Sequence, residues 1–245
     1  VWEDATTKEA YGRRRTYLRG RGLDAVMNYP FRNAVLGYLS GESVASVCEQ
    51  IMTICEHYPP PALNCLMNFL STHDTERALT VIAGEPANGR DRYWQSGRRV
   101  PPGRVDEGLR KMLLGYAMIY TLPGVPCIYY GDEIGMQGYR DPFNRAFFDW
   151  NSTEERLRGP LRNLARLRRT CDAIDGGRME IVRAEGDVLH YRRVGKNQTA
   201  EIIFNRGPHL LAETAFGKST EVNPGGFTVL VEDNAPEHVG YFSIY

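Results

Sequence analysis

Three short apolar runs lie within the first 175 residues. Residues 23–30, 65–70 and 125–130 are mostly apolar, and each is closed by a proline, a polar cluster or a glycine. Short runs bounded in this way are typical of buried strands. We therefore predict three buried strands, the first of which leads into a loop at Pro30.

Longer segments with helical spacing lie between and around these runs. We predict helices at residues 7–18, 43–57, 106–122 and 152–171. In the second segment apolar residues recur three and four positions apart, which is the spacing of one helix face. Ser43 and Ser152 are candidate N-caps of the second and the last helix.

The alternation of strands and helices predicts a parallel α/β arrangement. Residues 84–104 are rich in glycine, proline and arginine and predict a long loop within it. Three strand–helix units are too few to close a barrel. We therefore expect further strands to precede Val1, so that the chain is a fragment of a longer protein.

The pattern changes after Asp175. Strand-like runs separated by turns follow without a helical pattern, at residues 178–184, 187–194, 199–204, 227–231 and 240–244. Such a series predicts a small antiparallel β-sandwich. The sequence thus predicts two domains, residues 1–175 and residues 176–245.

Composition narrows the classes of partner. The 30 lysines and arginines equal the 30 aspartates and glutamates, so the chain lacks the basic excess typical of proteins that bind nucleic acids or anionic membranes. No apolar run approaches the roughly 18–20 residues of a membrane helix. We expect neither a nucleic acid nor a membrane as partner.

The pattern of the five cysteines indicates whether the protein is found in a reducing or an oxidising compartment. Their number is odd, several lie in apolar segments, and no CxxC pair is present. They predict buried free thiols in a reducing compartment, which favours a cytoplasmic location. No metal site is assigned, because no clustered His and Cys spacing suggests one.

Polar residues follow each predicted strand. They are Asn28 and Tyr29, His73 and Asp74, and the pair Asp132–Glu133. In parallel barrels and open α/β sheets, ligand sites form at this edge. Two interpretations of His73 and Asp74 stay open, namely a ligand site or a cap in which Asp74 holds the next helix.

The segment after the third run interleaves aromatic residues with polar ones. It contains Tyr139, Asp141, Phe143, Asn144, Arg145, Phe147, Phe148 and Trp150. Aromatic faces can stack on the C–H faces of a sugar, and Asp, Asn and Arg can hydrogen-bond its hydroxyls. The alternative is that the aromatic rings pack this loop onto the barrel.

Four motifs, in order, resemble those of the α-amylase family (glycoside hydrolase family 13). Residues 69–77 read FLSTHDTER and resemble the segment after the seventh barrel strand, and residues 124–135 read GVPCIYYGDEIG and resemble the eighth strand. Residues 141–145, DPFNR, are similar to a loop of the neopullulanase, cyclomaltodextrinase and maltogenic amylase branch. Residues 1–5 and 24–30 resemble the end of strand five and strand six.

The resemblance implies the C-terminal part of a (β/α)8 barrel, with strands six to eight and their helices, followed by a small antiparallel β-sandwich. It implies a retaining glycosidase that acts on α-glucosidic bonds of maltodextrins, cyclodextrins or pullulan. Asp74 matches a carboxylate that stabilises the transition state, and His73 matches a neighbouring hydrogen-bond donor. We predict further substrate contacts at Asn28, Tyr29, Asp141, Asn144 and Arg145.

The resemblance also implies that two catalytic groups lie upstream of this chain. Retention needs a nucleophile and a general acid about 5–5.5 Å apart. The family nucleophile follows strand four, and the general acid is the Glu expected directly before Val1. Glu3 is not that acid by the motif, so we expect this chain alone to be inactive.

Two alternative functions are also compatible with the sequence. A non-catalytic carbohydrate-binding module stays open, as does an unrelated α/β enzyme that uses His73 and Asp74 differently.

An opened barrel exposes sheet edges that pair with other chains, so we expect self-association or association with the missing N-terminal half. No cofactor is assigned, although the resemblance allows calcium in the intact protein.

Overall fold

The computed structural model of the chain describes residues 9–10, 13–14, 24–214 and 216–234. Near the N-terminus, β1 (Glu9–Ala10) and β2 (Arg13–Arg14) pair in antiparallel fashion. The helix predicted at residues 7–18 is therefore wrong at these four positions, and its remainder lies outside the described residues. The motif at residues 1–5 and the strand predicted at 240–244 also lie outside them.

A parallel sheet joins three segments that are far apart in the sequence. The backbone at Met27 bridges to β3 (Met67–Asn68), which pairs in parallel with β4 (Val125–Pro126). Hydrogen bonds continue on both sides, from the Met67 N–H to the Val26 carbonyl at 3.0 Å and from the Cys127 N–H to the Asn68 carbonyl at 2.7 Å. The three predicted segments pair in sequential order, but each is shorter than predicted, and the first contributes only the bridge at Met27.

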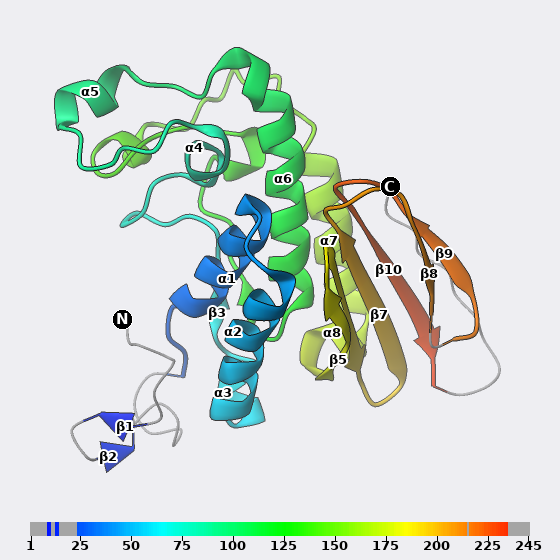
Figure 1. Cartoon of the computed structure of the whole chain (residues 1–245). Coiled ribbons are helices and arrows are strands. Elements are labelled where there is room, and N and C mark those ends of the chain that lie inside the picture. Colours follow the sequence, from blue (N-terminus) through cyan, green and yellow to red (C-terminus); the bar gives the residue numbers. More distant parts are fainter. Residues whose placement is uncertain (1–8, 11–12, 15–23, 215, 235–245) are drawn as a thin grey trace.

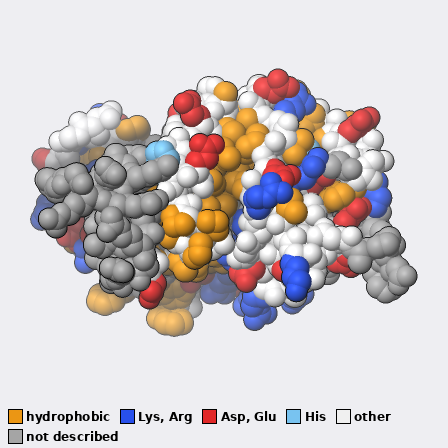
Figure 2. Space-filling model, turned by 90° about the horizontal axis from the view of Figure 1, so that it is seen from below, with side chains coloured by type: hydrophobic (Ala, Val, Ile, Leu, Met, Phe, Trp, Pro, Cys, Tyr) orange, Lys and Arg blue, Asp and Glu red, His pale blue; other side chains and the backbone are white. Residues whose placement is uncertain are grey.

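The prediction that all three strands are buried is wrong at β4. Val125 is 48% exposed, although it stands in the most apolar of the three runs. The described part of the sheet has no strand beyond β4, so this side chain and this sheet edge meet solvent. Figure 2 shows hydrophobic side chains reaching the surface across the middle of the molecule on the face seen from below.

A helix, α1 (Tyr29–Ser40), replaces the loop that Pro30 predicted. Proline is tolerated in the first helical turn, where its missing N–H leaves no bond unmade. The Asn28 side chain accepts a hydrogen bond from the Phe31 N–H and caps the helix, and Gly41 ends it in the left-handed region at φ 100°. The chain therefore turns from strand to helix within two residues.

The second predicted helix is confirmed as α2 (Val44–His57). Its buried residues are Val44, Val47, Ile51 and Ile54, the four that define the helical pattern. Ser43 occupies the N-cap position but makes no side-chain cap hydrogen bond. The prolines that follow end α2 and begin the short α3 (Pro60–Leu63).

The arginine-rich segment is only partly a loop. After β3 come α4 (Ala78–Ala83), α5 (Arg92–Gly97) and the long α6 (Pro102–Thr121). The Asp91 side chain caps α5 by accepting from the Trp94 N–H. Because Pro102 fits the first turn, α6 begins four residues before the predicted start at 106.

The helix predicted at residues 152–171 begins later than expected. Two short 3-10 turns, η2 (Asp132–Ile134) and η3 (Phe143–Arg145), follow β4, and α7 (Arg158–Thr170) and α8 (Asp172–Gly176) complete this part. Ser152 is therefore no N-cap. The segment before α7 is held by an ion pair of Arg156 with Glu154 and by another from Arg156 to Asp106 at 2.6 Å.

Two antiparallel sheets form the last part of the chain. The first has the strand order β10-β7-β6-β5 and contains β5 (Arg178–Glu185), β6 (Val188–Val194), β7 (Gln198–Asn205) and β10 (Gly226–Asp233). The second pairs β8 (Leu210–Glu213) with β9 (Ser219–Val222), which the sequence pattern did not predict. Val188, Ile203 and Val222 pack between the sheets, so the predicted sandwich is confirmed.

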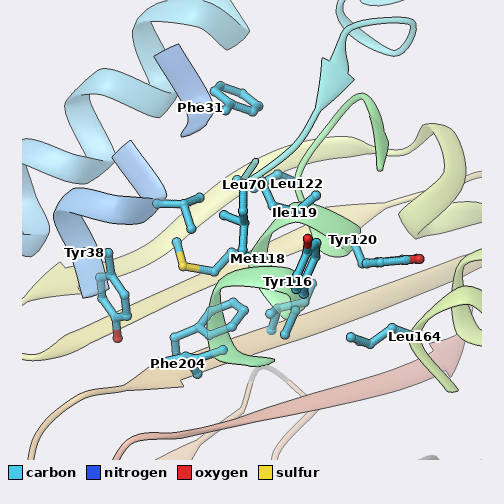
Figure 3. Close-up of a cluster of buried hydrophobic side chains, with 14 of the residues drawn as sticks. Phe31, Tyr38, Leu70, Tyr116, Met118, Ile119, Tyr120, Leu122, Leu164 and Phe204 are labelled. Carbon is cyan, nitrogen blue, oxygen red and sulfur yellow. The ribbon is translucent and has the colours of Figure 1, made fainter. Parts of the chain in front are cut away.

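One continuous core joins the helices to the four-stranded sheet. In Figure 1 the helices stand between the loop-rich side, with α4 and α5, and this sheet. Tyr38 of α1 packs edge-on against Phe204 of β7 at a centroid distance of 6.4 Å, and Figure 3 shows both rings near Met118 of α6. The predicted domain boundary at residue 175 lies where the helices end and the strands begin. The hydrophobic core nevertheless continues across this boundary.

A buried arginine connects the four-stranded sheet to the helices through hydrogen bonds. Arg193 of β6 donates hydrogen bonds to the Thr121 carbonyl at the end of α6 (2.6 Å) and to the Gly177 carbonyl (2.8 Å). Burial lowers the pKa of its guanidinium to about 10. The guanidinium satisfies carbonyls that the end of α6 and the start of the sheet would otherwise leave unpaired.

Candidate active site

An exposed acid–base pair lies in the loop after β3. His73 Nε2 is 3.2 Å from the Asp74 Oδ2 atom, and the two side chains are 56% and 57% exposed. The loop is closed by a hydrogen bond from the Thr72 N–H to the Thr75 hydroxyl at 3.0 Å. The N-cap of α4 is Arg77, without a side-chain cap bond, so the interpretation of Asp74 as a helix cap is wrong.

Two residues of the loop after β4 reach the same place. Arg145 Nη2 lies 3.9 Å from Asp74 Oδ1, and Arg145 Nε lies 2.8 Å from Asp141 Oδ1. The structure thus brings together four of the predicted site residues, which we call the surface cluster: His73, Asp74, Asp141 and Arg145. All four side chains are about half exposed or more, so a ligand can reach them from solvent.

Asn144 holds the surface cluster from beneath. Its Nδ2 atom lies 2.9 Å from the His73 carbonyl and 2.7 Å from the Thr75 carbonyl, and it also faces the Thr72 carbonyl at 3.3 Å. The residue is fully buried. A side chain without exposed surface cannot touch a sugar, so we correct the predicted substrate contact at Asn144 to a positioning role for the loop of His73 and Asp74.

Arg77 links the loops further down. It is 0% exposed, donates from Nε to the Asn144 carbonyl at 3.0 Å and from Nη1 to the Tyr130 carbonyl at 2.6 Å. Its guanidinium also lies over the Tyr129 ring, 4.7 Å from the centroid. A planar cation with five donors suits such a junction, because it can satisfy several carbonyls from fixed directions.

Asp132 is the anion of this buried layer. Its Oδ1 lies 3.3 Å from Arg77 Nη1, and its Oδ2 accepts from the Ser71 hydroxyl at 2.5 Å and from the Tyr116 hydroxyl at 2.6 Å. Burial raises the pKa of Asp132 to about 6, and the hydrogen bonds from Ser71 and Tyr116 and the charge of Arg77 act in the opposite direction. The buried layer of Arg77, Asp132, Ser71 and Tyr116 therefore ties the ends of two strands to α6.

The two residues after the first strand have different surroundings. Asn28 is fully buried, and its Nδ2 donates to Asn68 Oδ1 at 2.9 Å while its Oδ1 caps α1. We therefore correct the predicted substrate contact at Asn28 to a structural role. Tyr29 is half-buried and packs edge-on against Phe69 at 4.9 Å, so a contact with ligand at Tyr29 stays a prediction.

Arg32 contacts the backbone next to the loop of His73 and Asp74, and the sequence pattern did not indicate it. Its Nε donates to the Leu70 carbonyl at 2.8 Å, directly before the loop of His73. Burial lowers the pKa of its guanidinium, while nearby Tyr29 and Glu76 raise it. The sequence pattern predicts a loop after Pro30 and therefore gives no reason to place Arg32 at this edge. In the structure a helix begins there, and an arginine near the start of a helix that follows a strand faces the same sheet edge.

Metal ligation has little support among the residues that the structure describes. Within them, no group of three or more His, Cys, Asp or Glu side chains could hold a metal ion. The calcium that the resemblance allows for the intact protein therefore stays a prediction. No helix in the described part of the chain is long and apolar enough to cross a membrane.

Comparison with known sequences shows to which protein family the chain is related. Residues 3–173 match the family of the α-amylase catalytic domain. The chain is 32% identical to a cyclomaltodextrinase of Geobacillus thermopakistaniensis over 84% of its own length and 31% of that protein, and 31% identical to neopullulanase 2 of Thermoactinomyces vulgaris over the same shares. The chain thus spans about a third of the length of these curated relatives.

Solved structures agree with the sequence comparison. The fold resembles cyclic α-maltosyl-(1→6)-maltose hydrolase from Arthrobacter globiformis with a TM-score of 0.74 and 27% identity, over 89% of this chain and 46% of that one. That enzyme has been solved with maltose bound. The predicted fold class, part of a (β/α)8 barrel followed by a β-sandwich, is confirmed, and the chain belongs to the α-amylase family.

Proposed function

We propose that the surface cluster is part of the active site of a retaining glycosidase that cleaves α-glucosidic bonds of starch-type glucans. One observation carries the proposal: in a member of this family, His73, Asp74, Asp141 and Arg145 meet at the carboxyl edge of the parallel strands and face solvent. That edge is where barrel enzymes place their catalytic groups.

The geometry suggests a role for each group. The Asp74 carboxylate accepts hydrogen bonds from sugar hydroxyls, and its charge stabilises the oxocarbenium-like transition state. His73, 3.2 Å from Asp74, donates to the same hydroxyls. Arg145 lies between Asp74 and Asp141 and holds their oxygens on one side of the bound sugar.

The surface cluster alone cannot complete the reaction. A retaining mechanism needs a nucleophile and a general acid on either side of the bond, and the family motifs provide neither among the residues that match here. We expect no measurable turnover of maltooligosaccharides, cyclodextrin or pullulan by this chain by itself. Clear turnover by a preparation free of other amylases would contradict this.

Binding tests the site directly. Isothermal titration with maltotriose should show binding that Asp74→Asn weakens about tenfold or more, because a hydrogen bond to a charged group contributes about 1.5–3 kcal/mol. Asp24→Asn, which changes an exposed carboxylate before the first strand, is the matched control. Equal affinity of the wild type and Asp74→Asn would rule out the proposed site. Binding without turnover in the longer protein would favour the carbohydrate-binding module instead.

We also propose that the chain associates through its open sheet edge and resides in the cytoplasm. The exposed Val125 on β4 supports association through this edge, and a monodisperse monomer in light scattering would contradict it. The five cysteines are all free, which suits a reducing compartment. Fractionation of the source cells that found the protein outside the cytoplasm would overturn that location.

A further inference from the structure

Two adjoining cavities lie between α6 and the turn that leads into β10. Their volumes are about 460 Å³ and about 580 Å³, and both are lined by Arg110, Leu114 and Gly225. The first continues along β9 and β10, and the second reaches the end of α1. Volumes of this size fall within the roughly 300–1,000 Å³ of small-molecule sites.

The lining of the first cavity has a distinct chemistry. Its polar lining residues are Ser219, Thr220, Glu221, Asn223, Thr228 and Arg110, of which Thr228 is buried and donates from its hydroxyl to the Glu221 carbonyl at 3.4 Å. The charges of Glu221 and Arg110 balance, which favours a neutral ligand over an ion. Short polar groups beside a carboxylate and a guanidinium can form paired hydrogen bonds to neighbouring hydroxyls.

Two residues are available to a ligand in particular. The side chain of Arg110 is exposed at the junction of the cavities, and among the described residues it forms no hydrogen bond or ion pair, although its charge acts on nearby Glu107. Phe227 is half-buried, stacks on Phe204 with the centroids 5.7 Å apart, and also lines the first cavity. A supported aromatic ring beside hydroxyl-binding groups matches the apolar face and polar rim of a pyranose.

We propose that the groove formed by these cavities is a second oligosaccharide-binding site, separate from the surface cluster. No residue of the loops at 71–77 or 131–145 lines either cavity. The choice of an α-glucan as the sugar rests on the proposed function, whereas the site itself rests on the lining of the groove. All of its lining residues are described here, so the chain itself can be tested.

Titration of the whole chain with maltotriose separates the two sites. Arg110→Ala and Asn223→Ala should each weaken one class of binding about tenfold or more, while leaving the melting temperature unchanged. Arg104→Ala removes an exposed arginine of the same helix outside both cavities and is the matched control. In NMR, maltotriose should shift the amide signals of Gly225 and Gly226 in the wild type and not in Arg110→Ala.

The double variant His73→Ala/Asp74→Asn gives the deciding comparison. The inference predicts that this variant keeps the binding that Arg110→Ala removes. If the double variant binds no maltotriose while the wild type does, the second site is overturned and the proposed function stands. If Arg110→Ala binds like the wild type, the second site is overturned whatever the double variant does. If only Arg110→Ala reduces binding, the second site is supported and the proposed function fails.

Discussion

Two Arg–Asp pairs lie one above the other in this molecule, and their surroundings differ. At the surface, Arg145 Nη2 is 3.9 Å from Asp74, and the side chains are 46% and 57% exposed. Beneath, Arg77 Nη1 is 3.3 Å from Asp132, and both side chains are 0% exposed. Water screens the first pair and leaves its carboxylate open to ligand, whereas the second has only protein partners. The same two side-chain types are therefore accessible to solvent in the first pair and enclosed by protein in the second.

The largest contrast should appear when the buried cation is removed. Arg77→Met leaves Asp132 buried without its counter-charge, which should lower the free energy of unfolding by about 3–5 kcal/mol. For a chain of this size that corresponds to a fall in melting temperature of about 6–20 °C. Arg92→Met, at an exposed arginine of α5, is the control and should change stability by less than about 0.5 kcal/mol. Similar losses for the two variants would mean that burial does not distinguish them.

A smaller effect should depend on pH. The folded pKa of Asp132 is raised from 3.8 to about 6, so between these values the folded state binds more protons than the unfolded state. Stability from this group is therefore present below pH 4 and lost as pH rises through 6, by on the order of 2–3 kcal/mol.

Comparison with Asp132→Asn isolates this contribution. Urea unfolding of the wild type and of Asp132→Asn at intervals from pH 4 to pH 7 should show that the difference between them changes across this window. The same comparison for Asp74→Asn provides the exposed counterpart, since both substitutions remove one carboxylate. A constant difference between the wild type and Asp132→Asn over the window would show that Asp132 does not titrate there.

The smallest change in stability is expected at the surface pair. Arg145→Gln should alter the free energy of unfolding by less than about 1 kcal/mol, because an exposed ion pair contributes little. Its affinity for maltotriose should nevertheless fall, since the two carboxylates that Arg145 holds would separate. A loss of stability as large as that of Arg77→Met would contradict the division between the two pairs.

Sequence reasoning predicted the sheet edge better than the helices around it. The strands and α2 were predictable because apolar spacing alone defines them, as the burial of Val44 and Val47 shows. The sequence pattern hides the start of α1, because proline usually ends a regular element, although it also fits a first turn capped by Asn28. The late start of α7 follows from Pro160, which fits the first turn of a helix that begins at Arg158 but not the interior of one that begins at residue 152.

The site was predictable in its exposed part only. His73 and Asp74 stand out in sequence because a charged pair follows an apolar run, and the loop of Asp141 and Arg145 has its own motif. The contact between Asp132 and Tyr116 could not be derived from the sequence, since the two residues meet only after α6 packs across the strands. Asn144 was misassigned for the same reason, because its neighbours along the chain do not reveal that its amide faces inward.

The guanidinium of Arg193 has a practical consequence for anyone who would shorten this protein. A polypeptide stopped at residue 176 would keep all the helices that the structure describes, but the Thr121 carbonyl at the end of α6 would lose the donor that satisfies it. Tyr38 would also lose the ring of Phe204 that covers it. A cut at this point would therefore divide the hydrophobic core that the helices share with the four-stranded sheet.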